Sequence, residues 1–335
     1  MNEAPNKIRL LVGSSHTQVL YQPPTLGDLL VGLELEEALA MIPRLLPICA
    51  RAQQIAAERA SEAARGIPES DALRRQRDEE QRMEQGLAAA WRLLVDWPRF
   101  LEQAPDLSTL KQLRAAPRDA LARGLRSLVP AAHIQTGLDD WIEEIKHGDC
   151  TASAVLHHFP ELAPDVSLEL TRPAALVAAA GERLENRNTA SCGYVGALAM
   201  ARHPLVEALQ TRSDIRTDVA LLLAMLLDTL AIAEALADPE ADNNNPAPSL
   251  DAEASQRGLG WAITARGPLF HRAELDAENR VVDWQSLAPT DWHFASGGVV
   301  EALIRQRDAS ALNGVMLAVD PCAAWDVVDA TPEAA

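Results

Sequence analysis

The stretch RLLPICARAQ, residues 44–53, joins a proline-broken loop to the start of an alanine-rich helix pattern. The preceding stretch VGLELEEALAMI has helical periodicity and is expected to end at Pro43, since proline interrupts a helix. Cys49 is therefore expected at or near the first turn of the next helix. The amide dipoles there favour the thiolate, which is the form of cysteine that binds metal.

A second isolated cysteine lies near the other end of the chain, in AVDPCAAWDVV, residues 318–328. An Asp-Pro turn delivers Cys322, and Trp325 stands where metal-site motifs often repeat the cysteine. Buried cysteines more often pack in a core than bind metal. The residues alone therefore leave two interpretations open, a paired site formed with Cys49 or two packing thiols.

The other two cysteines carry weaker signals. Cys150 has His147 at a usable spacing, but no carboxylate or second cysteine completes a known metal pattern. Cys192 lies among small residues and is expected to pack in the core. The chain also contains no phosphate-binding glycine loop, no His-Glu-x-x-His zinc motif and no Cys-x-x-Cys pair.

Composition favours a mainly helical protein with a sizeable core. The 335 residues are 48% hydrophobic and only 4% aromatic, and alanine and leucine dominate. The formal charge of −18 argues against binding to nucleic acid or insertion at an anionic membrane surface, because both need a basic face. No secretory signal is recognised, and four cysteines without one are expected to stay reduced in the cytoplasm.

Helical patterns are expected to cover most of the chain up to residue 237. The most apolar run starts at Val219, and Asp228 near its middle argues for a buried helix, since a central carboxylate is costly in lipid. Two short strands are expected over residues 7–23. Other helices are expected over residues 70–100, 107–129, 138–146, 174–184 and 216–237.

The composition changes after residue 237. Residues 238–257 are acidic, rich in proline and asparagine, and expected to form a flexible loop. Residues 258–335 are expected to contain two or three strands, one more helix and the second cysteine motif. There is no internal repeat, and by its length the chain could form one large domain or two.

Four segments follow one another in the order RLLPICARAQ, ARGPLFH, APTDWHFAS and DPCAAWDVV. This order resembles that of the large subunits of nickel–iron hydrogenases, and most closely that of the HupK/HoxV-type accessory proteins that mature those enzymes. The resemblance covers both ends of the chain well and the middle loosely. It implies that residues 1–335 form a single domain with a mainly α fold and a small β portion, similar to the hydrogenase large subunit. In this fold the two terminal segments meet in the interior.

The first cysteine segment matches a large-subunit motif in part. It is similar to Arg-x-Cys-Gly-x-Cys-x-x-x-His, in which Arg44 and Cys49 match the arginine and the second cysteine. Leu46 and Gln53 replace the first cysteine and the histidine.

The last segment shows the same kind of departure. It is similar to Asp-Pro-Cys-x-x-Cys-x-x-His, in which Cys322 matches the first cysteine, and Trp325 and Val328 replace the second cysteine and the histidine. Nickel sites of this family depend on a cage of four thiolates, of which two are missing here. The resemblance therefore implies that no nickel is bound.

The resemblance also implies an iron site. Cys49 and Cys322 would ligate an iron carrying cyanide and carbon monoxide as thiolates, with Cys322 binding from a shifted position because it matches a nickel ligand. Arg266 in ARGPLFH and Thr290 in APTDWHFAS match the donors of hydrogen bonds to the two cyanides. Each cyanide buried without a donor would cost about 1–3 kcal/mol. His271 is a weaker candidate for supporting the site.

The implied function is that of an accessory scaffold in nickel–iron hydrogenase maturation. The scaffold would hold the iron dicyanide carbonyl unit transiently before its transfer to the hydrogenase large subunit. No bond-making step is assigned to the chain, so an enzyme is not expected. The expected partners are maturation factors, including a HypC-type small chaperone, and the precursor of the large subunit.

Two other interpretations remain open. In a metal-free adaptor or chaperone that binds hydrogenase subunits or other maturation factors, Arg266 would be a core ion-pair partner and Thr290 a turn residue. The cysteines would then pack in the core. In a thiol-dependent enzyme, Cys49 would need a histidine with an orienting partner, and none can be assigned from the sequence.

Overall fold

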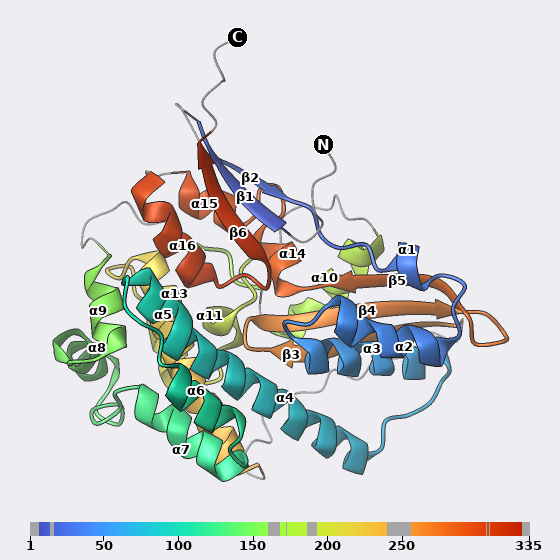
Figure 1. Cartoon of the computed structure of the whole chain (residues 1–335), viewed down its shortest axis with the longest axis horizontal. Helices are drawn as coiled ribbons and strands as arrows, with labels where there is room; N and C mark the ends of the chain where they lie inside the picture. The colour runs from blue at the N-terminus through green and yellow to red at the C-terminus, as the bar shows by residue number, and fades with distance from the viewer. Residues whose placement is uncertain are drawn as a thin grey trace.

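The computed structural model describes residues 7–13, 17–159, 168–171, 173–185, 193–239, 256–305, 307 and 309–329. Helices dominate these parts of the chain, and two small sheets lie beside them (Figure 1). The expectation of a mainly α fold with a small β portion is confirmed. Most of the expected acidic loop, residues 240–255, and Cys192 lie outside the described residues.

Several expected helices appear close to their expected bounds, among them those over residues 138–146, 174–184 and 216–237. The helices described are α1 (Gly27–Leu30), α2 (Leu35–Leu45), α3 (Ala50–Ala64), α4 (Asp71–Trp91), α5 (Trp97–Phe100), α6 (Leu107–Arg114), α7 (Arg118–Leu128), α8 (Leu138–His147), α9 (Thr151–His157), α10 (Pro173–Glu185), α11 (Ala197–Met200), α12 (Pro204–Gln210), α13 (Thr217–Ala237), α14 (Pro289–His293), α15 (Val299–Ile304) and α16 (Leu312–Val319).

Two helices differ from the expectation at prolines. Helix α2 passes through Pro43 and ends at Leu45, so the predicted end at Pro43 is wrong. A proline this close to the end of a helix removes only one backbone hydrogen bond, and the helix tolerates it. The predicted helix over residues 107–129 is two helices, because Pro117 is the N-cap of α7 and separates it from α6.

The two sheets bring distant parts of the chain together (Figure 1). In the first sheet β1 pairs antiparallel with β2 and parallel with β6, and in the second β3, β4 and β5 are antiparallel neighbours. All strands except β6 lie where the sequence predicted strands. The strands are β1 (Lys7–Val12), β2 (Thr17–Tyr21), β3 (Arg257–Thr264), β4 (Gly267–Leu275), β5 (Val281–Leu287) and β6 (Ala324–Asp329).

Helix α3 lies close against the second sheet because β3 carries two glycines. A Cβ atom on Gly258 would lie 2.1 Å from the backbone oxygen of Ala60, and one on Gly260 would lie 2.1 Å from that of Ala56. Only glycine allows two backbones to approach this closely. The GLG stretch is therefore a packing feature, and it fixes the helix that begins just after Cys49.

Helix α13 forms the centre of the core. It is long and apolar enough to cross a membrane, but 78% of its most apolar window is buried inside the fold. Asp228 near its middle accepts two hydrogen bonds from Arg202, of 2.6 and 2.8 Å. A buried carboxylate needs such a partner. The prediction of a buried core helix is confirmed.

Candidate functional site

Two thiols from opposite ends of the chain meet inside the molecule. Cys49 is the N-cap of α3, as expected, and only 6% of its surface is exposed. Cys322 lies in the turn between α16 and β6, where Asp320 adopts the left-handed conformation with a φ of 52°. The two sulfur atoms are 3.6 Å apart, and either thiol can donate the hydrogen bond between them. Apolar side chains of α3, β3 and β4 surround Cys49.

Arg266 reaches the thiol pair from the turn between β3 and β4. Its Nη1 lies 3.9 Å from Sγ of Cys49. Asp320 holds the guanidinium, since Nε donates to its backbone oxygen at 2.9 Å and Nη2 to its Oδ1 at 3.2 Å. The structure therefore brings together both cysteines and the arginine that the resemblance named.

Two charged residues that the sequence did not single out fix this arrangement. Arg92, in a π-helical turn that follows α4, donates to Oδ2 of Asp320 at 2.6 Å. Glu84 accepts two backbone N–H groups of the first turn of α3, at 2.8 and 2.9 Å, and so holds that turn beside Cys49. The Asp-Pro-Cys motif contains Asp320 and could have signalled it. Arg92 and Glu84 lie in ordinary helical patterns that carry no such signal.

The surrounding charges decide which thiol ionises first. The pKa of Cys322 is lowered, because it accepts the hydrogen bond of Cys49 and lies near Arg266, and these effects outweigh its burial. The hydrogen bond with Cys322 and burial raise the pKa of Cys49 well above its usual value. The expectation that the helix dipole favours the thiolate of Cys49 is therefore wrong when the two thiols bind no metal. Of the two thiols, Cys322 is the one that loses its proton first.

Asp320 remains a carboxylate in this setting. Burial raises its pKa, but the neighbouring guanidinium groups of Arg266 and Arg92 lower it by more. The ionised carboxylate keeps both arginines in place beside the thiols. The site is thus a compact set of charged groups, in which Arg92 and Arg266 surround Asp320, Glu84 lies at the first turn of α3, and the two thiols can ionise.

Thr290, in the first turn of α14, positions the second cysteine. Its Oγ1 accepts the backbone N–H of Cys322 at 2.9 Å, and its side chain is almost completely buried. Within the described parts of the chain, the hydroxyl hydrogen has no recorded acceptor, and a hydroxyl has one hydrogen to donate. The structure places Thr290 beside the pair, and its hydrogen bond to a cyanide stays a prediction.

His271, on β4, uses both of its ring nitrogens within the fold. Trp284 donates its Nε1–H to Nδ1 at 2.9 Å, so the proton is on Nε2, which donates to Oε1 of Gln53 at 2.6 Å. Burial lowers the pKa of His271 to about 3, and the ring is neutral. Gln53, which replaces the motif histidine, thereby ties the first turn of α3 to β4. His271 supports the site through that helix and has no free nitrogen for a metal.

The residues that replace the missing cysteines add no ligand to the pair. Leu46 is buried in a separate apolar cluster around α2, and Trp325 on β6 is 38% exposed. In the part of the chain that the structure describes, no group of three or more histidine, cysteine, aspartate or glutamate side chains is placed to hold a metal ion. A metal bound here would take two protein thiolates and its other ligands from elsewhere.

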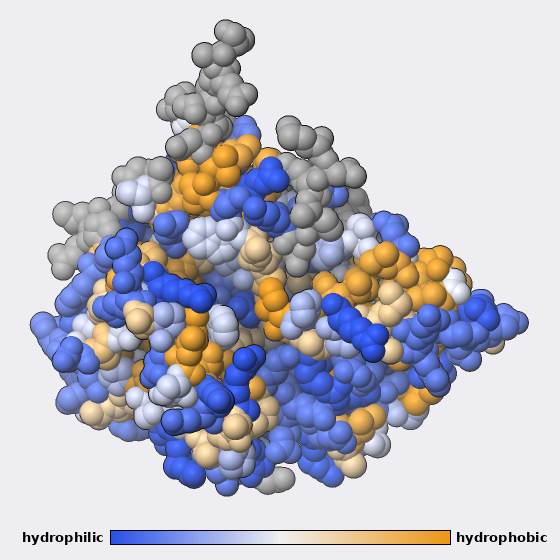
Figure 2. Space-filling model, viewed as in Figure 1, coloured by the Kyte–Doolittle hydropathy of each residue, from blue (hydrophilic) through white to orange (hydrophobic). Residues whose placement is uncertain are grey.

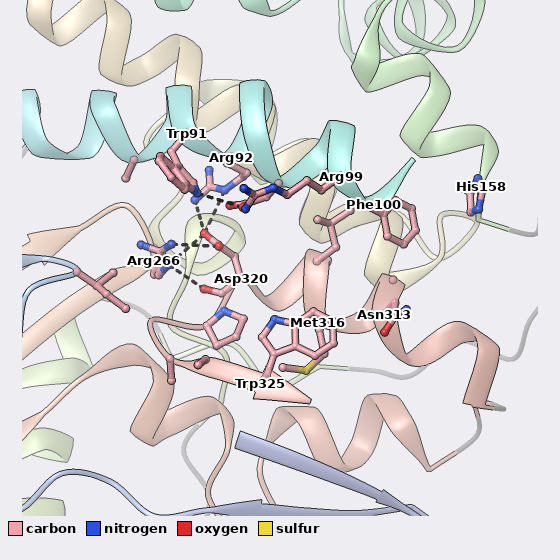
Figure 3. A pocket seen from close by; sticks show the side chains of 18 of the residues that line it. Trp91, Arg92, Arg99, Phe100, His158, Arg266, Asn313, Met316, Asp320 and Trp325 are labelled. Carbon is pink, nitrogen blue, oxygen red and sulfur yellow. Dashed lines mark hydrogen bonds and ion pairs between the residues drawn. The ribbon is translucent and has the colours of Figure 1, made fainter. Parts of the chain in front are cut away.

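A cavity of about 1220 Å³ is lined by Arg266 and Asp320 and by Ile48 and Pro321, the chain neighbours of the two cysteines, but not by the cysteines themselves. Figure 3 shows Trp91, at the end of α4, and Trp325, on β6, on opposite walls of this cavity. Both tryptophans are partly exposed, as is Ile48, which also lines the cavity. The cavity is therefore open to solvent, and Arg266, which lines it, also contacts Cys49.

Curated relatives share most of the length of this chain. It is 32% identical over 324 residues to the hydrogenase expression/formation protein HupV of Azotobacter chroococcum mcd 1, with 90% of each chain covered. It is 30% identical over 344 residues to the hydrogenase expression/formation protein HupK of Azotobacter vinelandii, with 91% of each covered. No protein-family model matches the chain.

Solved structures share the fold at much lower identity. An NAD⁺-reducing NiFe-hydrogenase in its H₂-reduced state aligns with a TM-score of 0.54 at 14% identity, over 92% of each chain. The reduced Ni-Fe-Se hydrogenase from D. vulgaris Hildenborough aligns with a TM-score of 0.52 at 14% identity, over 93% of this chain and 95% of that one. The expected likeness to the hydrogenase large-subunit fold is confirmed.

Proposed function

Because the chain belongs to the HupK/HupV family of hydrogenase expression/formation proteins, we propose that it acts in the maturation of a nickel–iron hydrogenase. In this role it holds an iron dicyanide carbonyl unit as cargo before the unit passes to the hydrogenase large subunit. The observation that supports the proposal most directly is the thiol pair, with Cys49 and Cys322 3.6 Å apart and Arg266 beside them. The role needs no bond-making step from the chain.

The separation of the two sulfurs suits bonds to one metal ion. With metal–sulfur bonds of about 2.3 Å, sulfurs 3.6 Å apart subtend an angle of about 100° at the metal. This angle lies between those of neighbouring ligands in octahedral and in tetrahedral sites. An iron with three diatomic ligands can therefore take Cys49 and Cys322 as further ligands with little movement of the backbone.

The charges around the pair suit an anionic cargo. Two thiolates and two cyanides bring negative charge into a largely buried place, and this is costly without nearby positive charge. Arg266 and Arg92 supply two positive charges at the pair, next to the carboxylates of Asp320 and Glu84. Arg266 and the hydroxyl hydrogen of Thr290 are the donors that we assign to the two cyanides.

Transfer requires that the cargo can leave. Two protein thiolates suit release better than four would, because fewer metal–sulfur bonds have to break before the unit can leave. We propose maturation factors, including a HypC-type small chaperone, and the large-subunit precursor as the partners between which the unit passes. No nickel enters this scheme, because Leu46 and Trp325 take the places of two thiolates.

One observation favours a second candidate function, that of a metal-free adaptor. Hydrophobic side chains gather at the surface over the β1–β2–β6 sheet (Figure 2), where Leu20, Trp325, Val327 and Val328 are each more than a third exposed. Exposed apolar groups of this kind are common where a partner protein binds. An adaptor needs this surface and does not need the thiols.

Infrared spectroscopy separates the two functions. The protein is purified without oxygen from a cell that makes hydrogenase, and its iron content and its cyanide and carbon monoxide stretching bands are measured. We expect bands from both ligands in the natural protein and in a Cys150→Ser control. We expect no bands in a Cys49→Ser/Cys322→Ser variant, which should also fail to support hydrogenase assembly. Absence of iron and bands from the natural protein, with assembly intact in the double variant, would overturn the carrier function.

A further inference from the structure

Arginines line the cavity at both buried and exposed positions. The inner two, Arg92 and Arg266, share the carboxylate of Asp320. The outer two, Arg99 and Arg114, are exposed, and within the described residues neither side chain has a recorded hydrogen-bond or ion-pair partner. Figure 3 shows Arg99 on the cavity wall, reaching toward Arg92. Positive charge therefore continues from the buried end of the cavity to its exposed part.

This lining contrasts with the formal charge of −18 on the chain. Two of the lining carboxylates are already engaged, since Glu84 accepts backbone N–H groups of α3 and Asp96 accepts Nε1–H of Trp91 at 3.1 Å. With five arginines and four carboxylates, the lining does not share the strong negative charge of the chain, and a cleft that is less negative than its surroundings favours anions. The lining arginines are Arg92, Arg99, Arg114, Arg216 and Arg266, and the lining carboxylates are Glu84, Asp96, Glu102 and Asp320.

We propose that Arg99 and Arg114 form an anion-capture site for cyanide-bearing iron complexes, which binds the cargo before the thiolates do. The identity of the cargo rests on the proposed function, whereas the anion site can be tested without it. The guanidinium group is weakly hydrated and presents several N–H donors in one plane, which suits the terminal nitrogens of bound cyanides. The captured anion then moves along the cavity toward Arg92 and Arg266.

Hexacyanoferrate(II) tests the capture step separately from ligation. It carries the same kind of ligand, but its iron is fully coordinated by cyanide and offers no open position to a thiolate. Its affinity for the full-length protein is measured by titration calorimetry at low and at high salt. The test variant is Arg99→Gln/Arg114→Gln. The matched control is Arg123→Gln/Arg126→Gln, which removes two exposed charges from α7, away from the cavity lining.

We expect Arg99→Gln/Arg114→Gln to lower the affinity for hexacyanoferrate(II) about tenfold at low salt, because two charge contacts are lost. The affinity of this variant should also depend less on salt than that of the natural protein. The control variant should bind like the natural protein. Equal weakening in both variants, or no measurable binding by the natural protein, would overturn the capture site.

The Cys49→Ser/Cys322→Ser variant separates this inference from the proposed function. It should capture hexacyanoferrate(II) normally, because the thiols take no part in that step. Loss of capture in this variant would contradict the proposal. Normal capture together with missing infrared bands in the natural protein would defeat the carrier function and leave the anion site standing. Infrared bands without capture would defeat the anion site alone.

Discussion

Arg92 and Asp320 are joined by two hydrogen bonds, of 2.6 and 3.1 Å, that connect the end of α4 to the turn of the second cysteine. Both side chains are at most 10% exposed. The pair is 228 positions apart in the sequence, so it ties the helical part of the molecule to its C-terminal segment. The same carboxylate also holds Arg266. One residue therefore maintains both cations of the site.

Replacement of Asp320 should be costly for the whole fold. Asp320→Asn leaves Arg92 and Arg266 buried without their counter-charge, and breaking a buried ion pair costs about 3–5 kcal/mol. We expect a loss of this size in the free energy of unfolding, measured by urea titration. Asp326→Asn is the matched control, because Asp326 pairs with Lys7 at the surface and its loss should cost less than about 1 kcal/mol. Equal losses in both variants would contradict the structural role of Asp320.

The two thiols should ionise in a fixed order. Cys322, with its lowered pKa, should be alkylated by iodoacetamide at lower pH than Cys49, whose pKa is raised. As the pH rises, the first thiolate appears on Cys322 and the second forms only well above the usual range for cysteine. Peptide mass spectrometry after brief alkylation at a series of pH values measures this order.

A single substitution tests the electrostatic cause of that order. Arg266→Gln removes a positive charge near both sulfurs and should shift the alkylation of Cys322 to higher pH. Arg272→Gln, on β4 and paired with Asp283, is the control and should leave the profile unchanged. Faster labelling of Cys49 than of Cys322 in the natural protein would contradict the assigned charge distribution.

Local patterns predicted the position of Cys49, the buried helix α13 and the strands β1 to β5, because each depends on residues close together in the sequence. The order of four short motifs predicted the large-subunit fold. Strand β6 was not predicted, since its apolar side chains are partly exposed and it is defined by parallel pairing with β1 at the other end of the chain. Pairing across more than three hundred residues has no local signal.

The candidate site could be predicted only as a set of residue types. The motifs named Arg266 and Thr290, but they could not indicate that Thr290 accepts a backbone N–H of Cys322. The hydrogen bond between Gln53 and His271 joins residues 218 positions apart, and it explains why glutamine can stand in the motif position of histidine. The order in which the two thiols ionise likewise depends on three-dimensional contacts and not only on the position of Cys49 at the start of a helix.

Oxidation should join the two thiols. Diamide accepts two electrons and two protons and would convert the Cys49 and Cys322 thiols, with sulfurs 3.6 Å apart, into a disulfide. We expect non-reducing peptide mapping to find these residues in one cross-linked species that dithiothreitol reverses, and we expect the oxidised protein to bind no iron. Cys150→Ser should not change the yield of the cross-linked species. Cys150 is the N-cap of α9 and has no partner thiol among the described residues. A cross-link that requires Cys150 would contradict the pairing.

Two buried histidines should make stability depend on pH. Burial lowers the pKa of His271 and of His293 to about 3, whereas an unfolded histidine titrates near 6.5. Between these values the unfolded chain takes up a proton that the folded chain does not, so stability falls as the pH falls, by about 1.4 kcal/mol per pH unit for each histidine. His271→Gln should therefore reduce the slope of unfolding free energy between pH 6 and 4 by about that amount. His157→Gln, at an exposed position, should leave the slope unchanged. If His271→Gln leaves the slope unchanged, His271 binds a proton in the folded chain as readily as in the unfolded chain, and the prediction is wrong.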